Sequence, residues 1–275
     1  MKKSNQQFII AVLILIIVIV YLFVTAPPPL NNKQQLDAQL PVEFVLRLAN
    51  EENKVVRKLY TKDIVQAGTK IGIKFDEKWQ KESVVAGMLP AQFLRETAMY
   101  LEKSPVRLGL YLGSKYPINE TNLIEGLQAT EFSKLTNKKQ DVFFNLPADE
   151  TFVFMSADIA VVKACVTCHN EHPETPKADW KMNDIMGATT WLYPRKAMSV
   201  NDALLLLSEL RNGFKYSYQL FLNEVKKMPK PYSIGNKWPD EGDFVPKTDT
   251  FMEKFSALAS HSTMEKLLAH TASNN

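Results

Sequence analysis

Cysteine is almost absent from this chain. Only Cys165 and Cys168 occur in 275 residues. If both serve chemistry, no disulfide remains to stabilise the fold. Stability must then come from a hydrophobic core, for which a chain of this length is sufficient.

An excess of charge of one sign is also missing, as are the common catalytic motifs. Lys and Arg total 33 and Asp and Glu total 30, so the net charge of +3 indicates neither nucleic acid nor a polyanionic partner. We find no GxSxG, no P-loop, no dinucleotide fingerprint and no Ser/His/Asp signature. The sequence therefore predicts no enzyme.

The two cysteines stand together in the stretch Cys165-Val166-Thr167-Cys168-His169. Cys-x-x-Cys-His is the attachment motif of a c-type haem. Two thiols about one helical turn apart can each add to a haem vinyl group, and the adjacent histidine can coordinate the iron through Nε2. The motif predicts one covalently attached haem c, with His169 as the axial iron ligand.

Three other interpretations of this motif stay open. A redox-active dithiol normally lies at a helix start in a thioredoxin-like βαβ pattern, which is not evident here. A zinc site would have to draw Cys165, Cys168, His169 and His172 from one short stretch, whereas structural zinc usually uses two separated ligand pairs. A structural disulfide is the third.

The N-terminus contains the one long hydrophobic run. Residues 8–24 carry no charge and would form a helix of about 26 Å, near the lower limit for a bilayer span. The prolines that follow Ala26 favour an uncleaved anchor over residues 1–26, with a stiff linker over 27–34. Lys2 and Lys3 predict a cytoplasmic N-terminus. The expected location is the bacterial inner membrane, single-pass, with the bulk of the chain in the periplasm.

Hydropathy patterning beyond the linker predicts an α+β fold, with a small antiparallel sheet, long N-terminal helices and a C-terminal helical extension. We expect one domain over 35–195 and the extension over 196–275. Helical periodicity covers 33–66, 76–85, 92–103, 120–135, 198–227 and 250–270, and alternation typical of strands covers 106–112, 141–146, 151–157 and 183–193.

Several segments resemble a known family. Residues 152–158, 164–170, 172–180 and 184–187 are similar to the bacterial c-haem, PAS-like periplasmic domain that commonly precedes histidine kinases, chemoreceptors and cyclases. The likeness extends loosely over 35–195. It implies a haem-binding, PAS-like fold that senses redox state or a small gas, or carries electrons.

Residues around the motif are candidates for the haem pocket. Aromatic side chains such as Phe154 and Trp180 could form apolar walls, and Arg107 and Lys177 could pair with the propionates. We expect Met88 or water as the sixth iron ligand. His172 is better placed to hydrogen-bond a propionate or the backbone than to reach the opposite face of the haem.

Two functions follow as hypotheses. The first is a haem-based sensor module for redox state or a small gas. The second is an electron-transfer cytochrome that exchanges electrons with a membrane partner.

Overall fold

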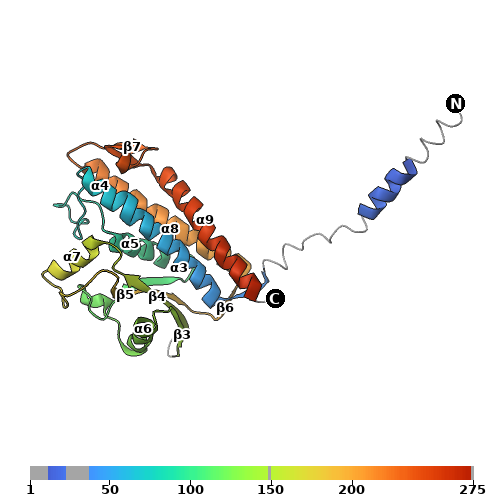
Figure 1. Cartoon of the computed structure of the whole chain (residues 1–275), viewed down its shortest axis with the longest axis horizontal. Coiled ribbons are helices and arrows are strands. Elements are labelled where there is room, and N and C mark those ends of the chain that lie inside the picture. Colours follow the sequence, from blue (N-terminus) through green and yellow to red (C-terminus); the bar gives the residue numbers. More distant parts are fainter. Residues whose placement is uncertain (1–11, 23–36, 148–149, 274–275) are drawn as a thin grey trace. The chain divides into compact units, whose positions relative to one another are not determined.

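The computed structural model describes residues 12–22, 37–147 and 150–273. Residues from Gln39 onward form one compact unit, and those up to Ala38 form another. The compact unit mixes long helices with small sheets, which confirms the predicted α+β class (Figure 1).

The predicted membrane anchor needs correction. Within the residues described, none of the helices is long and apolar enough to cross a membrane. Residues 12–22 of the N-terminal run are helical. Residues 1–11 and 23–36, which include the linker predicted over 27–34, lie outside the described residues. The predictions of a single-pass anchor, of the membrane as partner and of an inner-membrane location were wrong.

A four-stranded antiparallel sheet lies at the centre of the compact unit. Its order is β2 (Gly109–Gly113), β5 (Ile185–Tyr193), β4 (Thr151–Ile159) and β3 (Val142–Leu146). Neighbouring side chains of β4 point to opposite faces, so Phe154 enters the large helical core whereas Met155 packs in a smaller cluster with Phe132 of α6 (Gly126–Lys138). Both faces of the sheet are therefore covered.

The large core is built by four helices on one side of the sheet. They are α3 (Val42–Leu59), α5 (Pro90–Glu102), α8 (Val200–Lys227) and α9 (Thr248–Ser273). Figure 1 shows α3, α8 and α9 running side by side. Helix α3 continues through a π-helical stretch, Tyr60–Gln66, into the short α4 (Ala67–Lys70).

The segment beyond residue 195 belongs to this core. Leu210, Phe214 and Tyr218 of α8 and Phe251 of α9 are fully buried in it. The short strand β6 (Ala197–Ser199) pairs with β1 (Gln39–Pro41), and β7 (Ser233–Gly235) runs parallel to β8 (Phe244–Pro246). The predicted division at 195/196 thus falls inside one packed unit.

One predicted helix was wrong. Residues 76–85 form turns and irregular chain, and the side chain of Asp76 accepts a hydrogen bond from the backbone N–H of Lys78 at 2.7 Å, as in an Asx turn. A bridge between Phe75 and Gly87 closes this segment at its base.

Candidate functional site

The Cys-x-x-Cys-His motif lies on the helix α7 (Lys163–Glu171), which follows β4 after three residues. Cys165 and Cys168 are free thiols; the first is half-buried and the second exposed. His169 is half-buried in the last turn. Residues three and four apart share a helix face, so both sulphurs and the imidazole are displayed together. No residue of α7 is buried, and the helix therefore leaves this face available.

Partial burial shifts the pKa of each titratable group of the motif. It raises the pKa of both thiols, and Glu77 raises that of Cys168 further. Burial lowers the pKa of His169, which favours the neutral imidazole that binds a metal. Reactive dithiols need a lowered thiol pKa. The environment of α7 thus disfavours the dithiol interpretation.

An ion pair that the sequence analysis did not identify lies beside the motif. Arg57 of α3 binds both carboxylate oxygens of Asp158 through Nη2, at 3.0 and 3.1 Å, and donates through Nη1 to Thr189 Oγ1 at 3.3 Å. Asp158 acts electrostatically on both Cys165 and His169. The Nε of Arg57 is buried and has no hydrogen-bond partner among the described residues. A lone Arg in a long helix and a lone Asp at a strand end carry no sequence signal of pairing.

Side-chain hydrogen bonds hold the chain after α7 at two residues, Asn170 and His172. Asn170 donates through Nδ2 to the carbonyl of Trp180 at 3.0 Å and accepts from its N–H at 2.9 Å. His172 Nε2 lies 3.0 Å from Glu77 Oε2, and its Nδ1 accepts from the N–H of Glu174 at 3.1 Å. The contact between His172 and Glu77 joins the end of α7 to the turn segment that follows α4.

The predicted pocket residues are spread over different environments. Phe154 and Met88 are fully buried in the large core, where the Arg47 guanidinium covers the Phe154 ring at 4.8 Å. Arg107 is exposed just before β2. Lys177 lies over the ring of Trp180, with its ammonium 4.7 Å from the ring centre. Of this set, the structure brings together only Trp180 and Lys177, next to α7.

A covalently attached haem fits the residues that surround α7. The two thiols are unpaired, and the segment before α7 exposes two apolar side chains, Ile159 by 41 % and Val161 by 65 %. Met182, after Trp180, is 43 % exposed. By contrast, in the described ranges no group of three or more His, Cys, Asp or Glu side chains is arranged to hold a metal ion, so the zinc interpretation gains no support.

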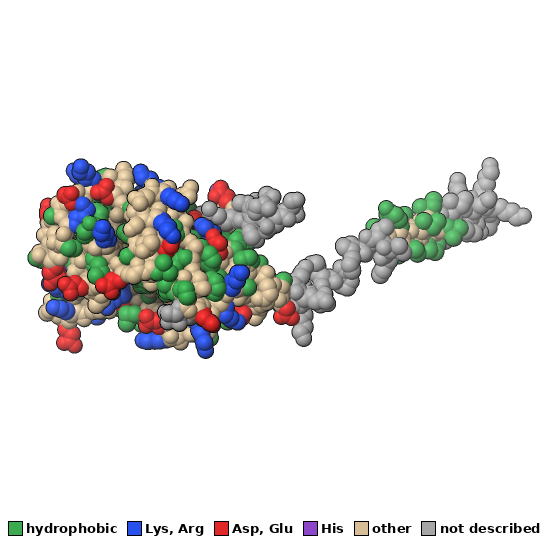
Figure 2. Space-filling view, turned by 90° about the horizontal axis from the view of Figure 1, so that it is seen from below, with side chains coloured by type: hydrophobic (Ala, Val, Ile, Leu, Met, Phe, Trp, Pro, Cys, Tyr) green, Lys and Arg blue, Asp and Glu red, His purple; other side chains and the backbone are tan. Residues whose placement is uncertain are grey.

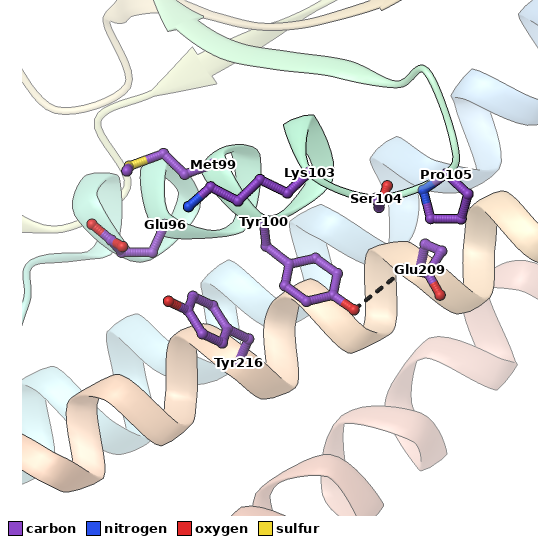
Figure 3. Close-up of a pocket in the computed structure, with 8 residues that line it drawn as sticks. All are labelled: Glu96, Met99, Tyr100, Lys103, Ser104, Pro105, Glu209 and Tyr216. Carbon is purple, nitrogen blue, oxygen red and sulfur yellow. Dashed lines mark hydrogen bonds between the residues drawn. The ribbon is translucent and has the colours of Figure 1, made fainter.

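Cavities of similar volume indent the described part of the compact unit. One, of about 330 Å³, lies between α6, the start of β5 and the chain around Tyr116 and Trp180. The other, of about 320 Å³, lies between α5 and α8 (Figure 3). There Tyr100 donates a hydrogen bond to Glu209 at 3.3 Å, and none of the predicted site residues contributes to the wall.

A family comparison bears on this site. The Tll0287-like family model matches residues 34–194. The chain belongs to the Tll0287-like family. This family is known as a haem-binding, sensor-like domain. The match includes α7, Arg57 and Asp158, but ends before α8 and α9. No curated protein and no solved structure matches the chain.

Proposed function

We propose that this Tll0287-like protein is a monohaem c-type protein that acts as a haem-based sensor of redox state or of a small gas, with a PAS-like fold. The observation that carries the proposal is the display of two unpaired thiols and a half-buried imidazole on one face of α7. The four-stranded antiparallel sheet, with α6 on one face, supports the PAS-like comparison.

The residues have separate roles in this proposal. Cys165 and Cys168 would hold the haem through thioethers, and His169 would bind its iron from one side. A bound haem supplies a one-electron redox centre and a site for a diatomic gas. Ile159, Val161 and Met182 offer apolar surface for it to cover.

Asp158 and Arg57 would set the charge next to the axial ligand. Metal-bound histidine usually donates its other ring N–H to a carboxylate, carbonyl or water, which fixes the ring and its tautomer. Asp158 is the carboxylate whose charge acts on His169, and Arg57 holds it in place.

Electron transfer is the second candidate function. It is favoured by the exposure of Cys168, which would leave one edge of an attached haem at the protein surface, accessible to a redox partner protein. Met88, if it approached the iron as sixth ligand, would have to leave the core in which it is fully buried.

An optical spectrum tests the proposal. The full chain is coexpressed with a cytochrome c maturation system and recorded oxidised, reduced, and reduced with CO. The proposal predicts a covalent haem spectrum whose Soret band shifts with CO. A spectrum that ignores CO supports the electron carrier instead, and the absence of covalent haem contradicts both functions.

A further inference from the structure

The two edges of the four-stranded sheet differ. At one edge, β2 begins and ends with glycine, and the next residue, Ser114, is bridged to Leu123 of the following segment. At the other edge lies β3, and none of the strands in the described ranges pairs with its outer side. Figure 1 shows β3 as the outermost strand of the sheet. One edge of the sheet is therefore left open.

Strand β3 lacks the features that normally keep an edge strand from pairing with another chain. Those features are charged side chains, proline and bulges. The sequence of β3, Val-Phe-Phe-Asn-Leu, contains no charge and no proline, and its pairing with β4 is regular at all five residues. Valine and phenylalanine also favour the extended conformation. The outer edge of β3 is therefore a template for a further strand.

This edge offers both backbone groups and apolar side chains. In an antiparallel ladder, alternate residues direct their N–H and C=O groups to one neighbour, and the residues between them direct theirs to the other side. Since β4 takes one set from β3, the second set faces outward. Val142, Phe143, Phe144 and Leu146 are only half-buried. A strand added here would remove more of their apolar surface from water, which is favourable.

The charges at the two ends of β3 have opposite signs. Lys138 and Lys139 precede the strand, and Glu150 follows it after the turn. All three side chains are exposed, and the ion pairs found among the described residues include none of them. A strand that pairs antiparallel with β3 should therefore place acidic groups near the two lysines and basic groups near Glu150.

A second copy of β3 meets this condition. Two copies overlap over their full length in one antiparallel register, with Phe144 on the two-fold axis. Val142 of one copy then lies opposite Leu146 of the other, and Phe144 lies opposite itself, an aromatic pair of the kind that stabilises sheets. The same axis brings the lysine end of each strand to the glutamate end of the other, whereas parallel pairing would place like charges together.

We propose that the outer edge of β3 is the contact surface for a second copy of this chain, paired antiparallel about Phe144. The two four-stranded sheets then form one continuous sheet. Because both copies use the same edge, the contact is isologous and the assembly closes as a dimer. A five-residue ladder is only about 17 Å long, so the dissociation constant should be weak, on the order of 10–100 µM.

Sedimentation of the full chain tests the contact. The mass should rise with concentration from 31.3 kDa towards twice that value. Lys138→Glu together with Lys139→Glu sets acid against acid at both ends, so dimerisation should weaken about tenfold. Lys226→Glu with Lys227→Glu makes the same change of charge at the end of α8 and is the matched control, which should dimerise as the parent does. Association through another segment, such as residues 12–22, would not respond to either change.

A mixture of variants shows whether the charges meet across the contact. Glu150→Lys should also weaken self-association, because its new lysine faces lysines of the second copy. An equimolar mixture of Glu150→Lys with the double variant at Lys138 and Lys139 restores opposite charges at both ends. This mixture should dimerise to within about threefold of the parent. A variant that merely misfolds cannot recover in this way.

Amide hydrogen exchange gives a second measurement on the parent chain. Exchange of the outward N–H groups of β3 should slow as the protein concentration rises, while exchange in β2 should not change. A mass that stays at 31.3 kDa up to millimolar concentration overturns the proposal. So does exchange in β3 that ignores concentration, or a mixture of variants that stays monomeric. Absence of covalent haem contradicts the proposed function but leaves this test unaffected.

Discussion

The helical side of the compact unit and the end that carries α7 are built in opposite ways. On the helical side aromatic rings are fully buried and in contact, as with Tyr218 and Phe251, whose centroids lie 3.9 Å apart. Helix α7 buries no residue at all. A segment that contributes little to the core is free to display reactive side chains, and the core must then hold the fold without it.

This contrast also appears in how charges are used. In the core, Glu52 is 1 % exposed and is bound by Arg211 Nε at 2.9 Å, so the pair joins α3 to α8. Beside α7, Arg57 and Asp158 keep 21 % and 30 % of their side chains exposed. Figure 2 shows Lys, Arg, Asp and Glu side chains intermixed over one face of the unit, without a large field of one sign.

Removal of the C-terminal helices should have the largest effect. A chain that ends at Arg195 loses α8 and α9, and with them the partners of α3 and α5 in the core. We expect no cooperative thermal unfolding by circular dichroism. A chain that starts at Gln39 is the control and should melt within a few degrees of the parent. Cooperative melting of the shortened chain would show that residues 39–195 form an independent domain.

Truncation of a single core side chain should have the second largest effect on stability. Phe214→Ala removes a fully buried ring that contacts Phe93 and Phe255, so the free energy of unfolding should fall by about 3–5 kcal/mol. Val161→Ala, at a side chain 65 % exposed beside α7, should change it by less than about 0.5 kcal/mol. Urea denaturation measures both. Similar losses of unfolding free energy at the two positions would contradict the conclusion that the α7 end contributes little to the core.

The ion pair next to the motif should have an intermediate effect. Arg57→Met leaves Asp158 without its partner and removes the contact with Thr189, which should cost about 1 kcal/mol because both groups keep contact with solvent. Lys78→Met, which removes a 3.7 Å contact with Glu77 from a side chain 58 % exposed, is the control and should cost almost nothing. Equal effects would mean that Arg57 is an ordinary surface charge.

The motif itself should matter least for stability and most for the haem. Replacing Cys165 and Cys168 together by serine should change the free energy of unfolding of the haem-free protein by less than about 0.5 kcal/mol. The same variant should abolish covalent haem, as judged by haem staining of a denaturing gel. A strongly destabilised variant would indicate that the thiols serve packing.

Much of the secondary structure was predictable from local pattern. Alternation located β3, β4 and β5, and helical periodicity located α5, α8 and α9 to within a few residues at most ends. The exceptions have physical reasons. The bond from the Lys78 N–H to Asp76 occurs in turns as well as at helix caps, and the switch from i→i+4 to i→i+5 hydrogen bonds after Leu59 has no residue-type signal of its own.

Of the candidate site, the sequence could predict only the residues that lie close together along the chain. The spacing of Cys165, Cys168 and His169 is a local feature, so the amino-acid sequence alone is sufficient to recognise the motif. Met88 and Phe154 were plausible pocket residues by type, but hydrophobic type alone does not distinguish core from pocket, and both lie in the core. Arg57 and Asp158 are 101 residues apart, and only folding brings them together.

The pairing of β1 with β6 has a mechanical consequence. These two three-residue strands place Gln39 opposite Ser199, which is also the cap of α8. Tension applied to the chain ahead of Gln39 therefore loads this short ladder and the start of α3, which follows β1 directly, before it reaches α7. In a force-extension experiment the ladder should yield at low load, while the aromatic core behind it resists until the whole unit opens.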